Sequence, residues 1–300
     1  MITKKIKKYI LNPKLILKRL DDYRLITLKD EDYINMRYET TFNKKLNLEN
    51  PQTFNEKLQW LKLYDRNPEY IRMVDKYEVK KYVANIIGEE HIIPTLGIYN
   101  SFEEIDFQKL PNQFVMKCTH DSGSIIICKD KSKFNMEKAK NKINKALKYN
   151  YYYAGREWPY KNVKPRIIIE KYMEDSKLKE LVDYKVYAFN GEADYLMACY
   201  DRMKGNTKFL YYDKDWNLIK KFSYDGIKYG DSIRIPKPKN IDKMFEFANV
   251  LSKGIPFVRI DFYEMDGKLY FGELTFYPNA GFETGRTKEL DDYLDSKLKI

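Results

Sequence analysis

The segment FVRIDFYEMDGKLYFGELTFY, residues 257–277, is the most informative part of the chain. Polar and apolar residues alternate on both sides of Asp266-Gly267, a dipeptide that is typical of tight hairpin turns. A three-residue loop that starts at Asp266 would place Asp261 directly opposite Glu273. Two carboxylates that face each other repel unless a cation lies between them. The segment therefore predicts an antiparallel hairpin with a site for Mg²⁺, which prefers oxygen ligands.

The same two strands carry further polar side chains beside these carboxylates. Side chains alternate across a strand, so Arg259 shares the face of Asp261, and Thr275 shares the face of Glu273. An arginine at this place can neutralise a phosphoryl group during its transfer. The alternative is a solvent-facing pair of strands with incidental charges. Apolar neighbours such as Phe262 argue against this alternative, because they indicate a sheet with little free surface.

A second candidate site is the loop KCTHDSGS at residues 117–124, which lies between two short apolar segments. Its glycine and hydroxyl residues can offer N–H and O–H groups to phosphate oxygens, and Lys117 adds a positive charge. The loop lacks the Gly-Lys-Ser/Thr ending and the following helix of a Walker A motif. The alternative for the loop is an ordinary hairpin turn without a ligand. The alternative for His120 is a purely structural role.

The segment IIEKYM at residues 168–173 is a third candidate site. Its apolar start predicts a buried strand, and the connector after it can present backbone N–H and C=O groups to the edge of an adenine ring. The acidic residues just downstream can hold ribose hydroxyls. The alternative is a buried strand without a ligand.

Beyond these segments, the pattern of apolar residues predicts a mixed α and β chain. Thr53 and Glu56 form a capping-box pattern at the start of a helix over residues 53–64. Most predicted strands are joined by hairpins, so we expect antiparallel sheets and an α+β architecture. We expect further helices at residues 71–86, 136–148 and 241–253, strands at residues 94–99, 114–117, 125–128, 166–173, 183–189 and 193–200, and a hairpin over residues 209–222.

The chain has 300 residues, with 55 basic and 44 acidic side chains and a net charge of +11. This charge suits an anionic partner such as a nucleotide, an anionic lipid or an acidic glycan, and a solvated lysine-rich surface explains it equally well. The lysines of residues 136–148 have no interleaved aromatic residues, which argues against a nucleic-acid partner. Three cysteines without paired spacing argue against a disulfide framework or a zinc site, and they fit a reducing cytoplasm.

The N-terminal segment, residues 1–20, is basic and amphipathic. It can lie on anionic lipid at the inner face of the membrane, or it can pack as a helix on the protein's own body. No apolar stretch reaches the ~20 residues that cross a membrane, and no signal-peptide pattern follows the basic residues. We therefore expect a cytoplasmic protein, with peripheral membrane contact as the open alternative.

Six segments follow one another in a recognisable order: NPQTFNEKLQWLK at residues 50–62, VDKY at 74–77, LPNQFVMKC at 110–118, HDSG at 120–123, REWPY at 156–160 and GELTF at 272–276. Together they resemble the ATP-grasp superfamily and, more closely, the TupA-like ATP-grasp family of bacterial surface-polysaccharide gene clusters. The resemblance covers about residues 30–285. It implies an ATP-grasp fold, in which two α+β subdomains hold ATP between antiparallel sheets.

The resemblance also implies boundaries and single-residue roles. A helical region would span residues 1–70, a smaller lid subdomain residues 71–172, and a larger subdomain with the metal site residues 173–300. The superfamily commonly has Glu-x-Asn at the metal strand, and Thr275 stands in the place of that asparagine here.

The implied site residues fall into four groups. They are Lys76 and Lys117 at the ATP phosphates with His120, Ser122, Gly123 and Ser124 in a closing loop; Glu170, Lys171, Tyr172 and Met173 in the adenine hinge with Asp183 at the ribose; Asp261, Glu273, Thr275 and Asn279 at Mg²⁺; and Arg259 at the γ-phosphoryl group, with Lys185 and Arg202 as substrate or phosphate contacts.

The activity that the resemblance implies is amide-bond formation by an ADP-producing ligase. ATP and Mg²⁺ would activate a carboxylate as an acyl phosphate, which an amine then attacks. The expected substrates are an amino acid and a uronic acid or amino sugar of a capsular or cell-wall polysaccharide. Two other functions stay open. One is a glycosyltransferase of the same pathway with Asp213-Lys-Asp215 as its nucleotide-sugar motif, and the other is a non-catalytic binding protein on a decayed fold.

Overall fold

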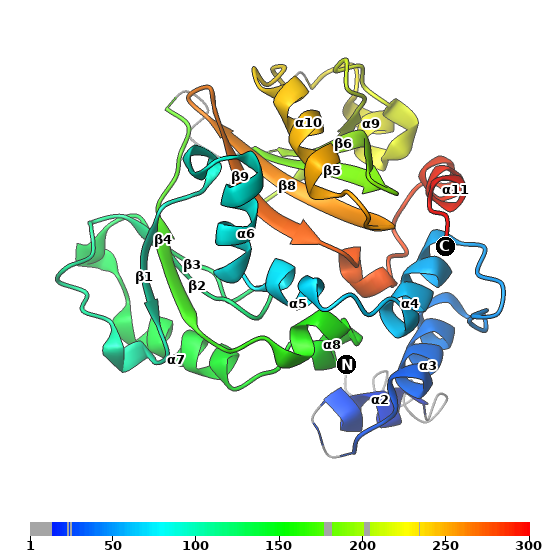
Figure 1. Ribbon diagram of the computed structural model, residues 1–300, viewed down its shortest axis with the longest axis horizontal. Helices are drawn as coiled ribbons and strands as arrows, with labels where there is room; N and C mark the ends of the chain where they lie inside the picture. The colour runs from blue at the N-terminus through cyan, green and yellow to red at the C-terminus, as the bar shows by residue number, and fades with distance from the viewer. Residues whose placement is uncertain (1–13, 23, 25, 177–181, 201–204, 234) are drawn as a thin grey trace.

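The computed structural model describes residues 14–22, 24, 26–176, 182–200, 205–233 and 235–300. Two antiparallel sheets form its frame, with helices around them (Figure 1), so the expected α+β class is confirmed. The four-stranded small sheet has the order β1-β4-β2-β3, from Thr95–Tyr99 (β1), Phe114–Cys118 (β2), Ile126–Cys128 (β3) and Ile167–Lys171 (β4). The five-stranded large sheet has the order β7-β6-β5-β8-β9, from Asp183–Phe189 (β5), Glu192–Tyr200 (β6), Lys208–Tyr212 (β7), Phe257–Met265 (β8) and Lys268–Thr275 (β9).

Helices cover the sheets and form the N-terminal region, which lies at the lower right of Figure 1. The helix α7, Met136–Leu147, packs on the small sheet through Ala139 and Ile143, which are buried in one cluster with Phe114 of β2. The other helices are α2 (Lys14–Asp22), α3 (Asp30–Phe42), α4 (Phe54–Tyr64), α5 (Glu69–Val74), α6 (Glu78–Ile87), α8 (Tyr152–Gly155), α9 (Tyr224–Tyr229), α10 (Ile241–Leu251) and α11 (Lys288–Lys297).

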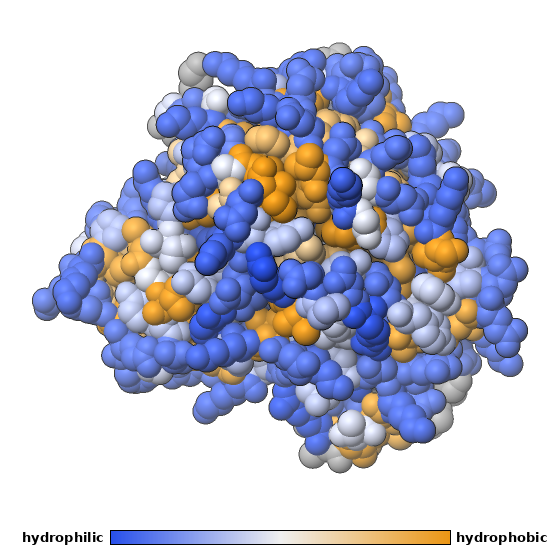
Figure 2. All heavy atoms as spheres, in the orientation of Figure 1, coloured by the Kyte–Doolittle hydropathy of each residue, from blue (hydrophilic) through white to orange (hydrophobic). Residues whose placement is uncertain are grey.

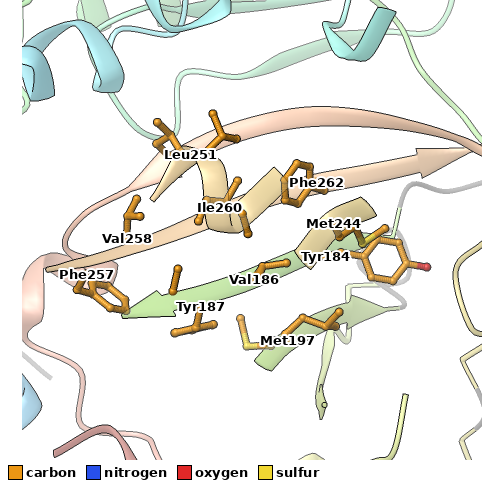
Figure 3. Close-up of a cluster of buried hydrophobic side chains, with 14 of the residues drawn as sticks. Tyr184, Val186, Tyr187, Met197, Met244, Leu251, Phe257, Val258, Ile260 and Phe262 are labelled. Carbon is orange, nitrogen blue, oxygen red and sulfur yellow. The ribbon is translucent and has the colours of Figure 1, made fainter. Parts of the chain in front are cut away.

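One face of the large sheet is apolar. Residues three or four apart on a helix share a face, so Met244 and Leu251 of α10 both turn toward the sheet, where Figure 3 shows them near Val186 and Ile260. Val186 and Ile260 are direct cross-strand partners on β5 and β8. Burial of each such aliphatic side chain stabilises the fold by roughly 1.5–3 kcal/mol. The next positions along both strands face the opposite side, which is the side of the candidate site.

The β8–β9 hairpin pairs Asp261 with Glu273, as the sequence predicts, but by another route. Met265 already pairs with Lys268, so the loop has two residues and the expected three-residue loop is wrong. The register then shifts at Gly272, where a bulge adds one residue to β9. Because a shift of one residue turns a side chain to the other face, the bulge brings Glu273 to the face of Asp261.

The helix expected over residues 71–86 is two helices, α5 and α6, which are separated at Asp75. The Asp75 Oδ1 atom accepts hydrogen bonds from the backbone N–H groups of Tyr77 at 2.9 Å and Glu78 at 3.4 Å. An aspartate that binds the backbone in this way caps the following helix and interrupts the preceding one. Lys76 therefore lies in a loop, not on a helix face.

The hairpin expected over residues 209–222 forms in part. The strand β7 pairs with β6, and a single bridge joins Tyr212 to Leu218 before a 3₁₀ turn. The Asp213 Oδ1 atom accepts hydrogen bonds from the N–H groups of Asp215 at 3.0 Å and Asn217 at 2.8 Å. Asp213 thus holds the turn, and this geometry does not favour a nucleotide-sugar site.

Thr53 and Glu56 form the predicted capping box at the start of α4. The three cysteines, Cys118, Cys128 and Cys199, are free and buried. Most of the basic N-terminal segment, residues 1–13, lies outside the described residues. Within the described ranges, no helix is long and apolar enough to cross a membrane.

Figure 2 shows hydrophilic residues over most of one face, with a hydrophobic area in the region of α6 and α10.

Candidate active site

A buried carboxylate at the end of β4 holds two lysines. Glu170 Oε1 lies 2.5 Å from Lys80 Nζ, and Glu170 Oε2 lies 2.6 Å from Lys117 Nζ. Burial would raise the pKa of the Glu170 carboxyl, but the two ammonium groups outweigh burial and lower it. The sequence predicts Lys117 as a phosphate ligand but misses Lys80. No local sequence pattern points to Lys80, because its partner Glu170 lies on a strand far away in the sequence.

Lys76 is anchored beside the loop at residues 117–124. Its backbone N–H donates to the Thr119 carbonyl oxygen at 3.0 Å, and its ammonium group donates to the Asp121 carbonyl oxygen. From the other side, Arg166 forms an ion pair of 2.7 Å with Asp75. The structure thus brings together the expected phosphate lysine and the expected phosphate loop.

The loop has a fixed base and an exposed tip. The Ser124 hydroxyl donates to Asp121 Oδ1 at 2.7 Å and accepts from the Cys118 N–H at 2.8 Å, and all three residues are buried. Ser122 and Gly123 are exposed at the tip, where the φ of 100° at Gly123 favours glycine. The tip is therefore the part of the loop that a ligand can reach.

His120 is held away from this tip. Its ring is buried, and Nε2 lies 3.2 Å from the carbonyl oxygen of Ala146 and 3.1 Å from that of Tyr149, at the end of α7. These contacts tie the loop to α7, which is the structural role that the sequence leaves open. A part for His120 in nucleotide binding stays a prediction.

The expected adenine hinge follows Glu170 directly. The exposed Lys171 donates its backbone N–H to the Pro94 carbonyl oxygen at 3.0 Å. The Tyr172 hydroxyl donates to Glu174 Oε1 at 2.8 Å, and Met173 is buried. These contacts fix the segment where β4 leaves the small sheet, and its contact with adenine stays a prediction.

The large sheet carries a row of charged side chains on the face away from α10. Lys185 on β5 is the direct cross-strand partner of Asp261 on β8, and Asp261 is also the partner of Glu273 on β9. Arg259 and Thr275 form the next pair along the same face. Three neighbouring strands thus bring the predicted metal ligands together with two cations.

Asp261 is the centre of this row and is 1% exposed. Arg259 binds both of its oxygens, with Nε 2.7 Å from Oδ1 and Nη2 2.7 Å from Oδ2. Lys185 forms an ion pair with Oδ2 and lies 2.7 Å from Asp183, the expected ribose ligand. Burial would raise the pKa of the Asp261 carboxyl, but Arg259 and Lys185 outweigh burial and lower it.

The chemistry of these donors fits Mg²⁺, which takes carboxylate, water and phosphate oxygens. A carboxylate has about four lone-pair sites, and the contacts from Arg259 and Lys185 leave one of them on Asp261 Oδ1. The Glu273 side chain is 45% exposed and lies 3.6 Å from Arg259. In the described part of the chain, no group of three or more His, Cys, Asp or Glu side chains is placed to hold a metal. An ion here would therefore depend on water and phosphate oxygens for the rest of its shell.

Three other residues of the expected site are Thr275, Asn279 and Arg202. Thr275 Oγ1 accepts a hydrogen bond from Arg259 Nη2 at 3.1 Å. Asn279 lies in a 3₁₀ turn after β9 and lines a cavity beside that strand. Arg202 lies outside the described residues. Metal binding by Thr275 or Asn279 stays a prediction.

A buried glutamate from the REWPY segment is influenced by charges from several parts of the candidate site. Burial raises the pKa of Glu157 to about 7, against the opposing charges of Lys62 and Arg37, and Glu273 and Lys76 also act on it. Charges from the large sheet and from the loop that holds Lys76 thus both act on Glu157. The sequence assigns Glu157 no role, and the REWPY segment itself is the signal that points to it.

Several solved ligase structures are similar to this chain. D-alanine–D-alanine ligase from Bacillus anthracis matches with 14% identity and a TM-score of 0.39, over 80% of this chain and 63% of that one. The corresponding ligase from Helicobacter pylori matches with 15% identity and a TM-score of 0.41, over 82% and 69%. The ATP-grasp ligase PsnB complexed with a minimal precursor matches with 10% identity and a TM-score of 0.41, over 81% and 68%. The chain thus spans less than two thirds of the first of these proteins. Among curated protein sequences, none matches it.

The family is shown by the sequence itself. Residues 56–299 match the TupA-like ATPgrasp family, which is most of the chain. The matched range contains the loop at residues 117–124, the segment at residues 170–173 and the hairpin with Asp261 and Glu273. The family that the six sequence segments predict is therefore confirmed, and the chain belongs to the TupA-like ATP-grasp family.

Proposed function

We propose that the protein is a ligase that uses ATP and Mg²⁺ to join a carboxylate to an amine, with release of ADP and phosphate. The observation that carries the proposal is the buried Arg259–Asp261–Lys185 network beside the half-exposed Glu273 carboxylate. Phosphoryl transfer needs cations for the phosphate oxygens and hard oxygen ligands for the metal. This chain supplies both kinds of group on one face of the large sheet.

In the first step, a carboxylate oxygen of the substrate attacks the γ-phosphorus of ATP. The bond between that phosphorus and the bridging oxygen breaks, and ADP leaves with the electron pair. Lys76 and Lys117 bind the phosphate groups, and Arg259 neutralises charge on the transferring group. Mg²⁺ held by Asp261 and Glu273 would supply further charge neutralisation.

In the second step, the amine nitrogen attacks the acyl carbon of the acyl phosphate. A C–N bond forms, the C–O bond to phosphate breaks, and phosphate leaves with the electron pair. The ammonium group gives up two of its protons, one to the phosphate and one to solvent. Closure of the loop tip at Ser122 and Gly123 would exclude water and so protect the acyl phosphate from hydrolysis.

The natural substrates in this proposal are an amino acid or amine and a uronic acid or amino sugar of a capsular or cell-wall polysaccharide or its precursor. The support for this choice is the resemblance to a family of surface-polysaccharide gene clusters. The boundaries near residues 70 and 172, and an adenine ring at residues 170–173, belong to the same proposal.

Nucleotide titration tests the proposal. We expect ATP binding that requires Mg²⁺, and ADP release when an amino acid and glucuronic acid are both present. Glu273→Gln should abolish ADP release and keep the fold, because the side chain is half exposed. Unchanged ADP release in this variant would contradict the metal site. Preferential binding of a UDP-sugar by the unaltered protein would favour the glycosyltransferase instead.

A further inference from the structure

A cavity of about 520 Å³ adjoins the end of β9 and reaches the expected metal site at Asn279. It lies where α3, α8 and the turn after β9 come together (Figure 1). Its wall includes Arg37 of α3, Tyr151 just before α8, Glu157 just after α8, and Asn279 and Phe282 after β9. The cavity thus joins the N-terminal helices to the strand that carries Glu273.

Glu157 presents a buried negative charge to this cavity. The residue is 6% exposed. Among the residues that the structure describes, its carboxylate has no hydrogen bond or ion pair. A buried charge destabilises a protein unless a partner compensates it. A buried carboxylate without a direct partner is expected on a cavity wall where a cationic ligand binds and supplies that partner.

Arg37 presents the opposite charge to the same cavity. One of its N–H groups donates to the Ala154 carbonyl oxygen, and its guanidinium group lies 4.1 Å above the Phe282 ring. No ion pair joins it to a carboxylate of the described residues. A guanidinium group has five N–H donors, so several remain for a ligand. The contact with Phe282 holds the group in a defined plane.

The Glu157 carboxylate and the Arg37 guanidinium group both lie near Gly155. A Cβ atom added there would lie 3.5 Å from Glu157 Oε1 and 3.6 Å from Arg37 Nη1. Within the described chain the two side chains do not pair with each other. A small molecule with an ammonium group and a carboxylate group would satisfy both through charge-assisted hydrogen bonds. The other acid on the wall, Glu283, already has a partner in Arg286 at 3.1 Å.

A buried lysine holds the cavity walls in place. Lys62 Nζ donates to the Gly155 carbonyl oxygen at 2.7 Å and to the Ala280 carbonyl oxygen at 2.9 Å. Asn279 and Ala280 both have positive φ, at 50° and 54°. Such backbone persists only where the surrounding structure enforces it. The hydrogen bonds of Lys62 therefore fix the turn after β9 against α8.

We infer that this cavity binds the amine substrate as a zwitterionic amino acid, with Glu157 at its ammonium group and Arg37 at its carboxylate. The inference rests on the proposed ligase function, since it places the amine next to the strand that would hold Mg²⁺. The cavity wall includes Asn279 and Ala280 of the turn that directly follows β9, the strand of Glu273. A bound amino acid would therefore lie beside the acyl phosphate that its nitrogen attacks.

Matched ligands test each charge separately. ADP release is measured with the standard proteinogenic amino acids, and then with the decarboxylated amine of the best one. Arg37→Met should raise the KM of the amino acid by roughly 10- to 100-fold and leave the KM of the amine unchanged. Glu157→Gln should raise the KM of both, and Glu157→Asp should restore part of the loss. The KM of ATP should stay the same in all variants, which a general structural defect would not allow.

Two exposed residues provide controls. Glu246→Gln on α10 and Arg72→Met on α5 remove the same charges at exposed positions that do not line the cavity, and they should leave all constants unchanged. Equal KM values for the amino acid and its decarboxylated amine in the unaltered protein would overturn the inference, even if the variants failed to fold. In that case Mg²⁺-dependent ATP binding would still support the ligase. Failure of the unaltered protein to bind ATP would instead overturn the proposed function.

Discussion

Asp261 and Glu273 face each other across one strand pair, yet their surroundings give them different properties. Asp261 is buried and compensates two cations, whereas the Glu273 carboxylate is half exposed and has one contact, at 3.6 Å, with Arg259. Removal of one member of a buried ion pair leaves an uncompensated charge, and this costs far more than the loss of an exposed pair. Asp261 therefore organises the row of charges, and Glu273 remains available to a ligand.

This contrast predicts different stabilities for two variants that should both lose ADP release. Asp261→Asn should destabilise the protein by about 3–5 kcal/mol, because Arg259 and Lys185 lose their shared counter-ion. Glu273→Gln should change the free energy of unfolding by less than about 1 kcal/mol. Urea denaturation of both variants measures the difference. Similar losses of stability would show that Asp261 does not organise the row.

Glu157→Gln should stabilise the protein, and the gain should grow as the pH rises. Burial raises the pKa of Glu157 to about 7 in spite of Lys62 and Arg37, and Glu273 and Lys76 also face it. A carboxyl with a raised pKa in the folded state favours folding below its unfolded pKa and loses that contribution as the pH passes its folded pKa. The substitution should therefore have a more favourable effect on stability at about pH 8 than at about pH 4.

Thermal unfolding between about pH 4 and pH 8 measures this gain. At the acidic end, where Glu157 is protonated in both states, the variant and the unaltered protein should have nearly equal stability. A gain of the same size at every pH would mean that the Glu157 carboxyl is not responsible for it.

The bulge in β9 controls which face of the sheet Glu273 occupies. Without the extra residue, Glu273 would pair with Ile260 and face the apolar side under α10. Gly272 allows the bulge because its backbone lies close to β8. A Cβ atom there would lie 2.9 Å from Tyr263 Cε2 and 3.0 Å from the Asp261 carbonyl oxygen.

Gly272→Ala should therefore destabilise the hairpin by about 1–3 kcal/mol, the usual cost of overpacking. ADP release should also fall, because Glu273 shifts from its position opposite Asp261. Gly285→Ala is the stability control, since an added Cβ there would meet nothing within 4 Å. Equal stability of the two variants in urea denaturation would show that the bulge tolerates a side chain.

The sequence predicts those elements whose signals are local. The apolar periodicity of α10 and the alternation in β8 and β9 depend on neighbouring residues, and both elements form where they are expected. The break between α5 and α6 depends on Asp75, which also pairs with Arg166 from a distant part of the chain. The pairing of Asp261 with Glu273 follows from a local hairpin, so sequence patterns predict it. They do not reveal Lys80, because its partner Glu170 lies on a strand far away in the sequence.

Residues from both sheets and from the N-terminal helices line the candidate site and the cavity beside it. The small sheet carries Lys117, the large sheet carries the row around Asp261, and α3 carries Arg37. A buried ion pair of 2.6 Å between Arg156 and Asp21 fixes those helices against α8. The N-terminal helices are therefore packed firmly on the rest of the fold and are not an independent appendage.

Ligand binding at such a junction should stabilise the whole fold. A ligand at 100 times its Kd adds about 2.7 kcal/mol to the folded state, so ATP with Mg²⁺ should raise the Tm. Lys117→Met should lose most of this shift, because it removes a phosphate-binding charge, while Lys80 still compensates Glu170. Lys138→Met on the exposed face of α7 removes the same charge and should keep the shift. Differential scanning calorimetry with and without Mg²⁺ measures these shifts, and equal shifts in both variants would exclude Lys117 from the nucleotide site.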